Sequence, residues 1–210
     1  MTTTKRDPDS LFVSVHATCS RLQEAYLSPG DNPAKHQARA TLAELRKIGS
    51  ADLSKNPLGL ETILFTLTPP LDEGSLGKGD RTSPSEAAAA TTLALFAIHM
   101  QSAKKPAHVE KTSFARACGQ LIARTQSQSI KPRIDAMLVA TNEHARMRHL
   151  RSLITLLRGQ ELGFDYARLA LDLRSLSHSE RRTGVLQRWG RDIAAGFHHT
   201  AATPEIETTE

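Results

Sequence analysis

The chain has 210 residues, 39% of them hydrophobic and only 4% aromatic, and a core built mainly from Leu, Ala and Ile predicts an all-α fold rather than aromatic-rich sheets. No run of about 18 apolar residues occurs and the N-terminus is polar, so we expect a cytoplasmic protein with no membrane span and no secretory signal. The net charge of +5 favours a polyanionic partner, although an arginine-rich solvated surface explains it equally well.

The first two helices are predicted over residues 9–27 and from residue 33 to about 49. In the first, apolar side chains recur at spacings of three and four and share one face: Phe12, Val15, Cys19, Leu22 and Tyr26. The second starts where Asn32 and Pro33 provide an N-cap and a first helical residue. Cys19 and Cys118 lie far apart without CxxC spacing, so both are predicted to be reduced thiols in helices.

The apolar stretch over residues 58–68 fits a helix or a buried strand, and we favour a helix because no other segment offers a partner strand. Residues 68–83 are rich in Gly, Pro and charge and predict a loop. Their GSLGKG stretch lacks the ending and the flanking elements of a phosphate loop. Ser83 and Glu86 form a capping box that opens an Ala-rich helix running to about Ala103.

A basic and flexible connector, KKPAHVEK (residues 104–111), divides the predicted helices into two packed bundles. We predict an N-terminal helical bundle over residues 1–103 and a C-terminal helical bundle over residues 112–199. Residues 200–210 are polar and acidic, which predicts a disordered tail.

The C-terminal half predicts several closely joined helices. One spans about residues 113–124. The next starts near residue 131 and must break near residues 141–142, because its apolar face and the later leucine face would point in nearly opposite directions on one straight helix. Asp165 is predicted to cap the helix that follows, and Ser177 with Glu180 to form a capping box for the last one. The last helix is predicted to bury four side chains: Val185, Leu186, Trp189 and Ile193.

Basic charge is concentrated in this half of the chain. Residues 111–192 hold 15 Lys or Arg, 13 of them Arg, against 7 Asp or Glu. Arg148, Arg151 and Arg158 fall within an arc of about 80° at about 100° per residue, and leucines fill the opposite side of the helix. Such a row can follow a phosphate backbone without reading bases, or it can be a solvated helix face.

Further basic pairs lie at predicted helix ends: Arg46 with Lys47, Lys131 with Arg133, and Arg181 with Arg182. Trp189 and Tyr166 follow the inward periodicity, so we expect them in the core rather than stacked on bases. Nucleic-acid binding would then depend on charge more than on stacking.

No catalytic motif is found: neither HExxH, nor GxSxG, nor paired cysteines, nor a carboxylate-rich loop occurs. Asp165, Asp172 and Asp192 are interpreted as a cap and exposed ion-pair partners, whereas a nuclease would need clustered carboxylates for metal ions. We therefore predict no enzymatic activity, no catalytic residues, no metal site and no cofactor. The alternative is a free-standing helical DNA-binding regulator, although the helix after Asn142 offers arginines and no Asn or Gln to read adenine.

Several segments resemble, in this order, the CasB family, the small subunit of the type I-E CRISPR Cascade complex. These segments are TLALFAIHMQ, SFARACGQL, PRIDAMLVATNEHARMRHLRSLITLLR, LGFDYARLALDLRSL and GVLQRWGRDIAAGF. The resemblance covers about residues 33–197 and is most specific over 131–197. The chain departs from the family at Ala115, where the family usually has Gly, and in the loop over residues 68–83.

The resemblance implies two packed helical bundles without catalytic activity, working in antiviral defence. Its implied partners are crRNA and target DNA, the backbone and large subunits of Cascade, and a second copy of the chain lying head to tail. The family's basic patches, which help to hold the guide–target heteroduplex and the displaced strand of the R-loop, would fall on Arg46, Lys47, Arg133, Arg148, Arg151, Arg181 and Arg182.

Overall fold

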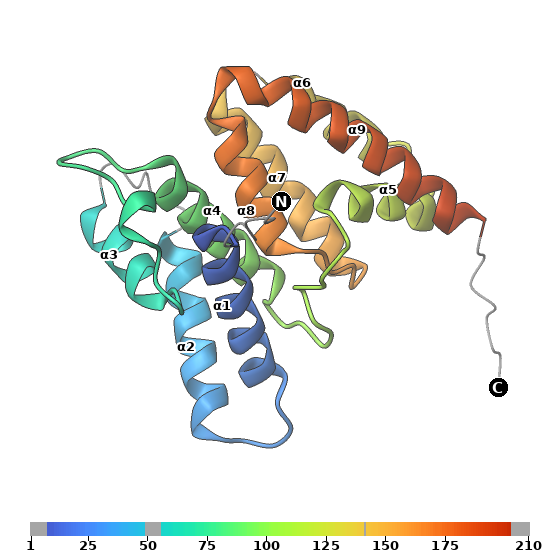
Figure 1. Ribbon diagram of the computed structural model, residues 1–210. Coiled ribbons are helices and arrows are strands. Elements are labelled where there is room, and N and C mark those ends of the chain that lie inside the picture. The colour runs from blue at the N-terminus through green and yellow to red at the C-terminus, as the bar shows by residue number, and fades with distance from the viewer. Residues whose placement is uncertain (1–7, 49–55, 141, 203–210) are drawn as a thin grey trace, which may run out of the picture.

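The computed structural model describes residues 8–48, 56–140 and 142–202. Within these ranges the chain forms nine α-helices, a 3-10 turn and no strand, which confirms the predicted all-α fold (Figure 1). The elements are α1 (Ser10–Leu27), α2 (Pro33–Ile48), α3 (Pro57–Thr66), η2 (Glu73–Ser75), α4 (Pro84–His99), α5 (Phe114–Thr125), α6 (Ile130–Val139), α7 (Glu143–Gly159), α8 (Tyr166–Leu176) and α9 (Ser179–Ala201).

Most of the predicted helix starts are confirmed by capping hydrogen bonds. The Asn32 side chain accepts from the backbone N–H of Lys35, and the Asp165 side chain accepts from that of Arg168. The Ser83–Glu86 capping box is complete, because each side chain accepts the backbone N–H of the other residue. These bonds satisfy N–H groups that the first helical turn leaves without partners.

Three predicted helix boundaries differ from the structure. The capping box at Ser177 and Glu180 is wrong: α9 begins at Ser179 without a side-chain cap, and the Ser177 hydroxyl instead donates to the Arg174 carbonyl at the end of α8. The Ala-rich helix stops at His99 rather than near Ala103. At the C-terminus α9 continues to Ala201, so residues 200–201 of the predicted tail are helical, and residues 203–210 lie outside the described part.

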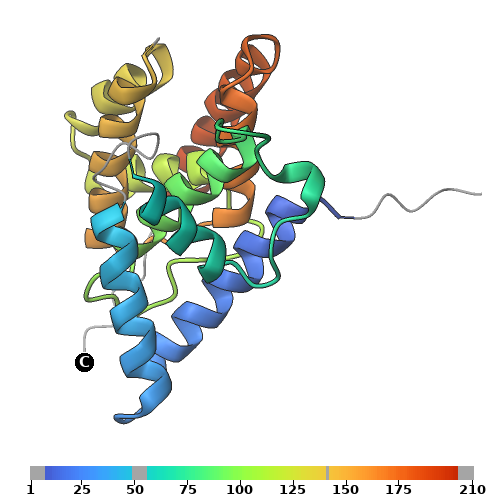
Figure 2. The ribbon, with the colours of Figure 1, turned by 90° about the vertical axis from the view of Figure 1, so that its left-hand side faces the viewer.

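Helix α4 lies at the centre of the fold and packs against α1, α2, α3, α7 and α8. In Figure 2 it lies between two arms, one formed by α6 and α7 and the other by α9. After its first residue, only Ala87, Thr91 and Ile98 are half-buried, and every other side chain of α4 is buried. These three residues lie on one stripe of the helix, but Ala94 in the middle of the stripe is buried, so α4 is open to solvent only near Ala87 and Thr91 and again at Ile98.

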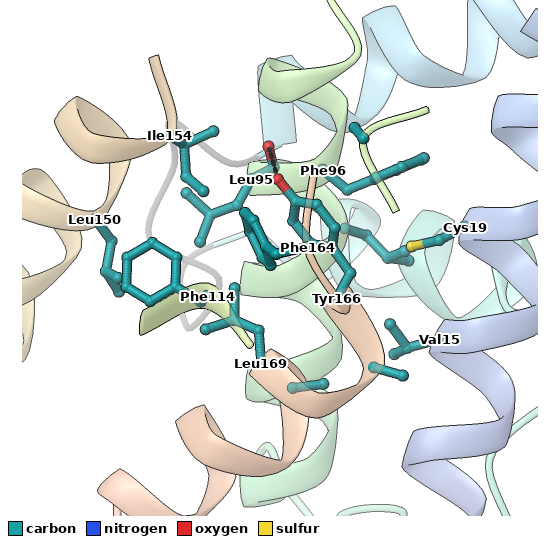
Figure 3. Close-up of a cluster of buried hydrophobic side chains, with 14 of the residues drawn as sticks. Val15, Cys19, Leu95, Phe96, Phe114, Leu150, Ile154, Phe164, Tyr166 and Leu169 are labelled. Atoms are coloured by element: carbon teal, nitrogen blue, oxygen red, sulfur yellow. Dashed lines mark hydrogen bonds between the residues drawn. The ribbon is translucent and has the colours of Figure 1, made fainter. Parts of the chain in front are cut away.

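The core crosses from the first half of the chain to the second through α8. Figure 3 shows Val15 and Cys19 of α1 facing Tyr166 of α8, with Phe114 and Leu150 on the far side of the same cluster. The Tyr166 hydroxyl is 2.8 Å from the Nδ1 atom of His99 on α4. The two predicted bundles therefore share one hydrophobic cluster, and their division at residue 103 stays a prediction.

The connector differs from the flexible segment that we predicted, because hydrogen bonds hold its middle part. Ala107 and His108 are buried. The Gln23 side chain bonds both backbone groups of His108, at 3.0 Å and 2.8 Å. The backbone N–H of Phe164 donates to the Ala107 carbonyl, and the Phe164 carbonyl accepts from the backbone N–H of Val109. The partners come from α1 and from the segment before α8, which no local sequence pattern of the connector indicates.

Helices α5 and α9 approach each other through glycines. A methyl group at Gly119 would overlap the backbone carbonyl of Ile193, and one at Gly196 would overlap that of Arg116. Cys118, beside Gly119 in α5, and Cys19 in α1 are both buried, and neither forms a disulfide. Both cysteines are unpaired and lie in helices, as predicted. Burial raises the pKa of both thiols.

Candidate nucleic-acid interface

The arginine row on α7 lies opposite the buried leucines, as the helical periodicity predicts. Leu150, Leu153 and Leu157 are buried, whereas Arg148 is exposed and Arg151 is half-buried. Neither guanidinium forms a hydrogen bond or an ion pair with any residue that the structure describes. Their charges thus stay available to a phosphate at the solvent side of α7.

Arg133 joins this surface from α6. Its Nη1 atom donates to the hydroxyl of Ser152 on α7, 3.2 Å away. Ser152 lies one turn after Arg148, so the two arginines share one side of the α6–α7 pair. Lys131, the other member of the predicted basic pair, instead forms an ion pair with Asp135 of its own helix.

Two of the predicted arginines bind the C-terminal end of α4. Arg46 of α2 donates to the Ala97 carbonyl, 3.2 Å away, and Arg158 of α7 donates to the Ile98 carbonyl, 3.3 Å away. Arg158 also donates to the Gln101 side chain at 2.8 Å. Cations are favourable beside the last carbonyls of a helix, so both arginines have a role within the fold that periodicity did not predict. Lys47 is exposed in the last turn of α2.

The last predicted pair opens α9 beside a groove. Arg181 is exposed, whereas Arg182 is half-buried and lines a cavity of about 140 Å³. The walls of this cavity come from α4, α7, the end of α8 with the turn that follows it, and the first turn of α9. We call this hollow the α4 groove, and its lining includes Ala87, Ala88 and Thr91 of α4, Arg146 and Met147 of α7, and Arg182 of α9.

Other arginines of the C-terminal half are paired with carboxylates. Arg188 pairs with Asp172, Arg168 with Asp192, and Arg174 with Asp9. None of these three arginines belongs to the candidate nucleic-acid-binding set. Acidic neighbours therefore neutralise arginines that tie helices together, whereas Arg148, Arg151, Arg181 and Arg182 enter no such pair with the described residues.

Asp172 forms an ion pair, as predicted, but the prediction that it is exposed is wrong. Its side chain is buried and accepts a hydrogen bond of 2.6 Å from the indole N–H of Trp189, in addition to the contact with Arg188. Asp172 lies at the edge of the apolar face of α8, where α9 covers it. Trp189 and Tyr166 are fully buried, which confirms their prediction as core residues.

No cluster of three or more potential metal ligands occurs among the described residues. In the same part of the chain, every helix is too short or too polar to cross a membrane. His198 and His199 are exposed on the last turns of α9.

Comparisons with known proteins identify the relatives of this fold. The family model described as CRISPR-associated protein Cse2 matches residues 41–192. The crystal structure of CasB from Thermobifida fusca is similar at 25% identity and a TM-score of 0.67, over 88% of this chain and 97% of that one. A Cse2-family CRISPR-associated protein from Thermus thermophilus shares the fold at 21% identity and a TM-score of 0.59, over 86% and 97% of the two chains. A search of curated proteins finds no match.

Proposed function

The chain belongs to the Cse2 family of CRISPR-associated proteins, as its resemblance to CasB predicted. From this premise we propose that it is a non-catalytic, nucleic-acid-binding small subunit of a type I-E Cascade complex. In this role it stabilises the crRNA–target heteroduplex and the displaced strand of the R-loop. Its partners would be crRNA, target DNA, the backbone and large Cascade subunits and a second copy of itself, in the cytoplasm.

The observation that carries the proposal is the row of guanidiniums on α7. Arg148 and Arg151 face away from the leucine core and form no ion pair with the described residues. Arg133 extends this surface from α6. Guanidiniums on such a surface would contact phosphates rather than base edges. The protein would therefore bind the sugar–phosphate backbone without regard to base sequence.

The physical effect that such a surface needs to supply is small. The heteroduplex formed in an R-loop is about as stable as the DNA duplex that it replaces, so modest contacts with phosphates can decide the direction of the exchange. Each phosphate that an arginine neutralises releases condensed counterions, which makes the contact favourable and sensitive to salt.

The double substitution Arg148→Ala/Arg151→Ala tests the proposal. We expect weaker binding of a labelled single-stranded oligonucleotide, and a plot of log K against log salt whose slope becomes shallower by about 0.7 for each phosphate that is no longer neutralised. Fluorescence anisotropy at several salt concentrations measures both quantities. Arg39→Ala/Arg191→Ala is the matched control, because it removes two exposed arginines from other helices, α2 and α9.

An unchanged slope for the α7 variant, or the same change in the control, would place the interface elsewhere. Discrimination between oligonucleotide sequences would favour the helical regulator over a Cascade subunit. Partner dependence is tested separately: the tagged chain, co-expressed with the other Cascade subunits and a crRNA, should co-purify with that crRNA. Isolation of the chain without RNA would contradict the Cascade role.

A further inference from the structure

Arg182 has a buried donor that none of the described residues satisfies. Its Nε atom is buried and has no hydrogen-bond partner in that part of the chain. Its guanidinium forms no ion pair with the residues that the structure describes. Buried polar groups nearly always have partners, and an exception points to a ligand or water that completes the site. The question is which ligand the surroundings of Arg182 would accept.

The α4 groove presents positive charge in a confined space. Arg146 of α7 lines the same cavity as Arg182 and is buried, with its Nη2 atom donating to the Ala140 carbonyl. None of the described side chains that line the groove is acidic. At about 140 Å³ the cavity is well below the roughly 300–1,000 Å³ of sites for drug-sized molecules, so it suits a single small group such as a phosphate.

The cavity lies at one end of the half-buried stripe of α4, and the middle of that stripe is closed because Ala94 is buried. Ala87 and Thr91 lie in the cavity, and Ile98 lies at the other end of the strip, where Arg158 reaches α4. Arg151 lies one turn after Met147 on the same side of α7. Along α7, Arg151 lies about 6 Å from Met147 at about 1.5 Å per residue, so a strand with one phosphate in the cavity reaches Arg151 within about two phosphates at about 3.4 Å each.

We propose that the α4 groove is a binding site for one single strand of nucleic acid, with Arg182 and Arg146 holding a phosphate in the cavity between α4, α7 and α9. Methyl groups of Ala87 and Met147 provide an apolar wall for the adjoining sugar. The site is sequence-blind because guanidiniums contact the phosphate and no base edge. This proposal rests on the proposed function, since it names the part of the protein that receives the strand.

The first test measures binding of oligothymidylate to the full chain and to Arg182→Gln. We expect about ten-fold weaker binding for Arg182→Gln, because the substitution removes a charge-assisted hydrogen bond inside a cavity. The matched control is Arg191→Gln, which removes the same charge from an exposed position on the same helix and should change binding by less than about two-fold. Ala87→Leu fills the groove without changing charge and should also weaken binding, whereas Ala194→Leu on the exposed face of α9 should not.

The second test uses thymidine 5′-monophosphate as the probe and the melting temperature as the readout. A ligand that binds only the folded state raises Tm, so the nucleotide should raise the Tm of the unchanged chain and of Arg191→Gln, compared with chloride at the same ionic strength. Arg182→Gln and Ala87→Leu should lose the shift. Equal shifts in all four proteins, or none in the unchanged chain, would overturn the proposal.

Failure of this site and failure of the proposed function give different results. If Arg182→Gln and Arg191→Gln weaken oligonucleotide binding equally while Arg148→Ala/Arg151→Ala still flattens the salt slope, the chain binds nucleic acid but not in the α4 groove. If thymidine monophosphate stabilises only proteins with Arg182 while no arginine variant changes oligonucleotide binding, the cavity is a phosphate site and the proposed function is wrong.

Discussion

Trp189 joins α9 to α8 and α5 through two different contacts. Its ring packs edge-to-face against Phe114, with centroids 5.4 Å apart, and its indole N–H donates to the buried carboxylate of Asp172. Arg188, the neighbouring residue, bonds the other oxygen of this carboxylate. Apolar burial and a charge-assisted hydrogen bond therefore act at the same residue.

Substitution of Trp189 separates these two contributions. Trp189→Ala should lower the free energy of unfolding by about 3–5 kcal/mol, because a large buried side chain is removed. Trp189→Phe keeps most of the packing but removes one donor from Asp172, and should cost about 1–3 kcal/mol. Urea denaturation measures both. If Trp189→Ala left stability unchanged and abolished nucleic-acid binding, Trp189 would be a base-stacking residue and not part of the core.

The sequence predicts whether a side chain points into the core better than it predicts which residues that side chain contacts. The inward periodicity of α8 and α9 correctly placed Tyr166 and Trp189 in the core. The burial of Asp172 was missed, because its hydrogen-bond partners lie on another helix and nothing in the local pattern of α8 indicates where α9 crosses it. The buried Nε of Arg182 was missed for the same reason.

At the scale of elements, the contact between α5 and α9 depends on the absence of two side chains. Gly119 and Gly196 each face a backbone carbonyl of the other helix, and a backbone atom cannot yield as the end of a flexible side chain can. Two other glycines of α9, Gly184 and Gly190, are exposed and face open space. The same substitution should therefore have opposite effects at these two kinds of position.

Gly119→Ala or Gly196→Ala should lower the free energy of unfolding by about 1–3 kcal/mol, because the added methyl forces the two helices apart. Gly184→Ala and Gly190→Ala should raise it by about 0.5–1 kcal/mol, because alanine is the better residue in a helix and nothing obstructs it. Denaturation with guanidinium chloride compares the four variants. Stabilisation at Gly119 would show that the contact between α5 and α9 is looser than described.

Most helices could be predicted because their boundaries are determined by residues next to them in the sequence. The Asn32–Pro33 start, the Ser83–Glu86 box and the break between α6 and α7 all follow from neighbouring residues. The Ser177 box failed because α8 and α9 meet in so short a turn that the Ser177 hydroxyl is used by α8. The binding of Arg46 and Arg158 to α4 spans 51 and 60 residues, which helix periodicity cannot indicate.

At the scale of the molecule, two buried histidines lie where the two halves of the chain meet. His99 on α4 is hydrogen-bonded to Tyr166 on α8, and burial lowers its pKa from 6.5 to about 4. His108 lies 2.9 Å from His16 of α1 and accepts the backbone N–H of Tyr166, and burial also lowers its pKa. Both side chains are therefore neutral in the folded protein at neutral pH.

Acid should weaken the folded state through these groups. Between pH 6.5 and about pH 4 the unfolded chain binds a proton at His99 that the folded chain does not, so stability falls as pH falls. The loss from His99 amounts to about 3 kcal/mol over this range. Urea denaturation of the unchanged chain and of His99→Gln at several pH values measures it. The glutamine variant should show a weaker dependence on pH, and an identical dependence would mean that His99 is accessible to protons.

The order of synthesis has a consequence for a core that both halves of the chain complete. Val15 and Cys19 of α1 are covered by Tyr166 of α8, so the first four helices leave the ribosome without the helix that closes them. At about 5–20 residues per second, α8 follows α4 by several seconds. During that interval the nascent chain exposes the apolar face of α1 that α8 later covers. A ribosome-associated chaperone that shields this face would increase the yield of soluble protein.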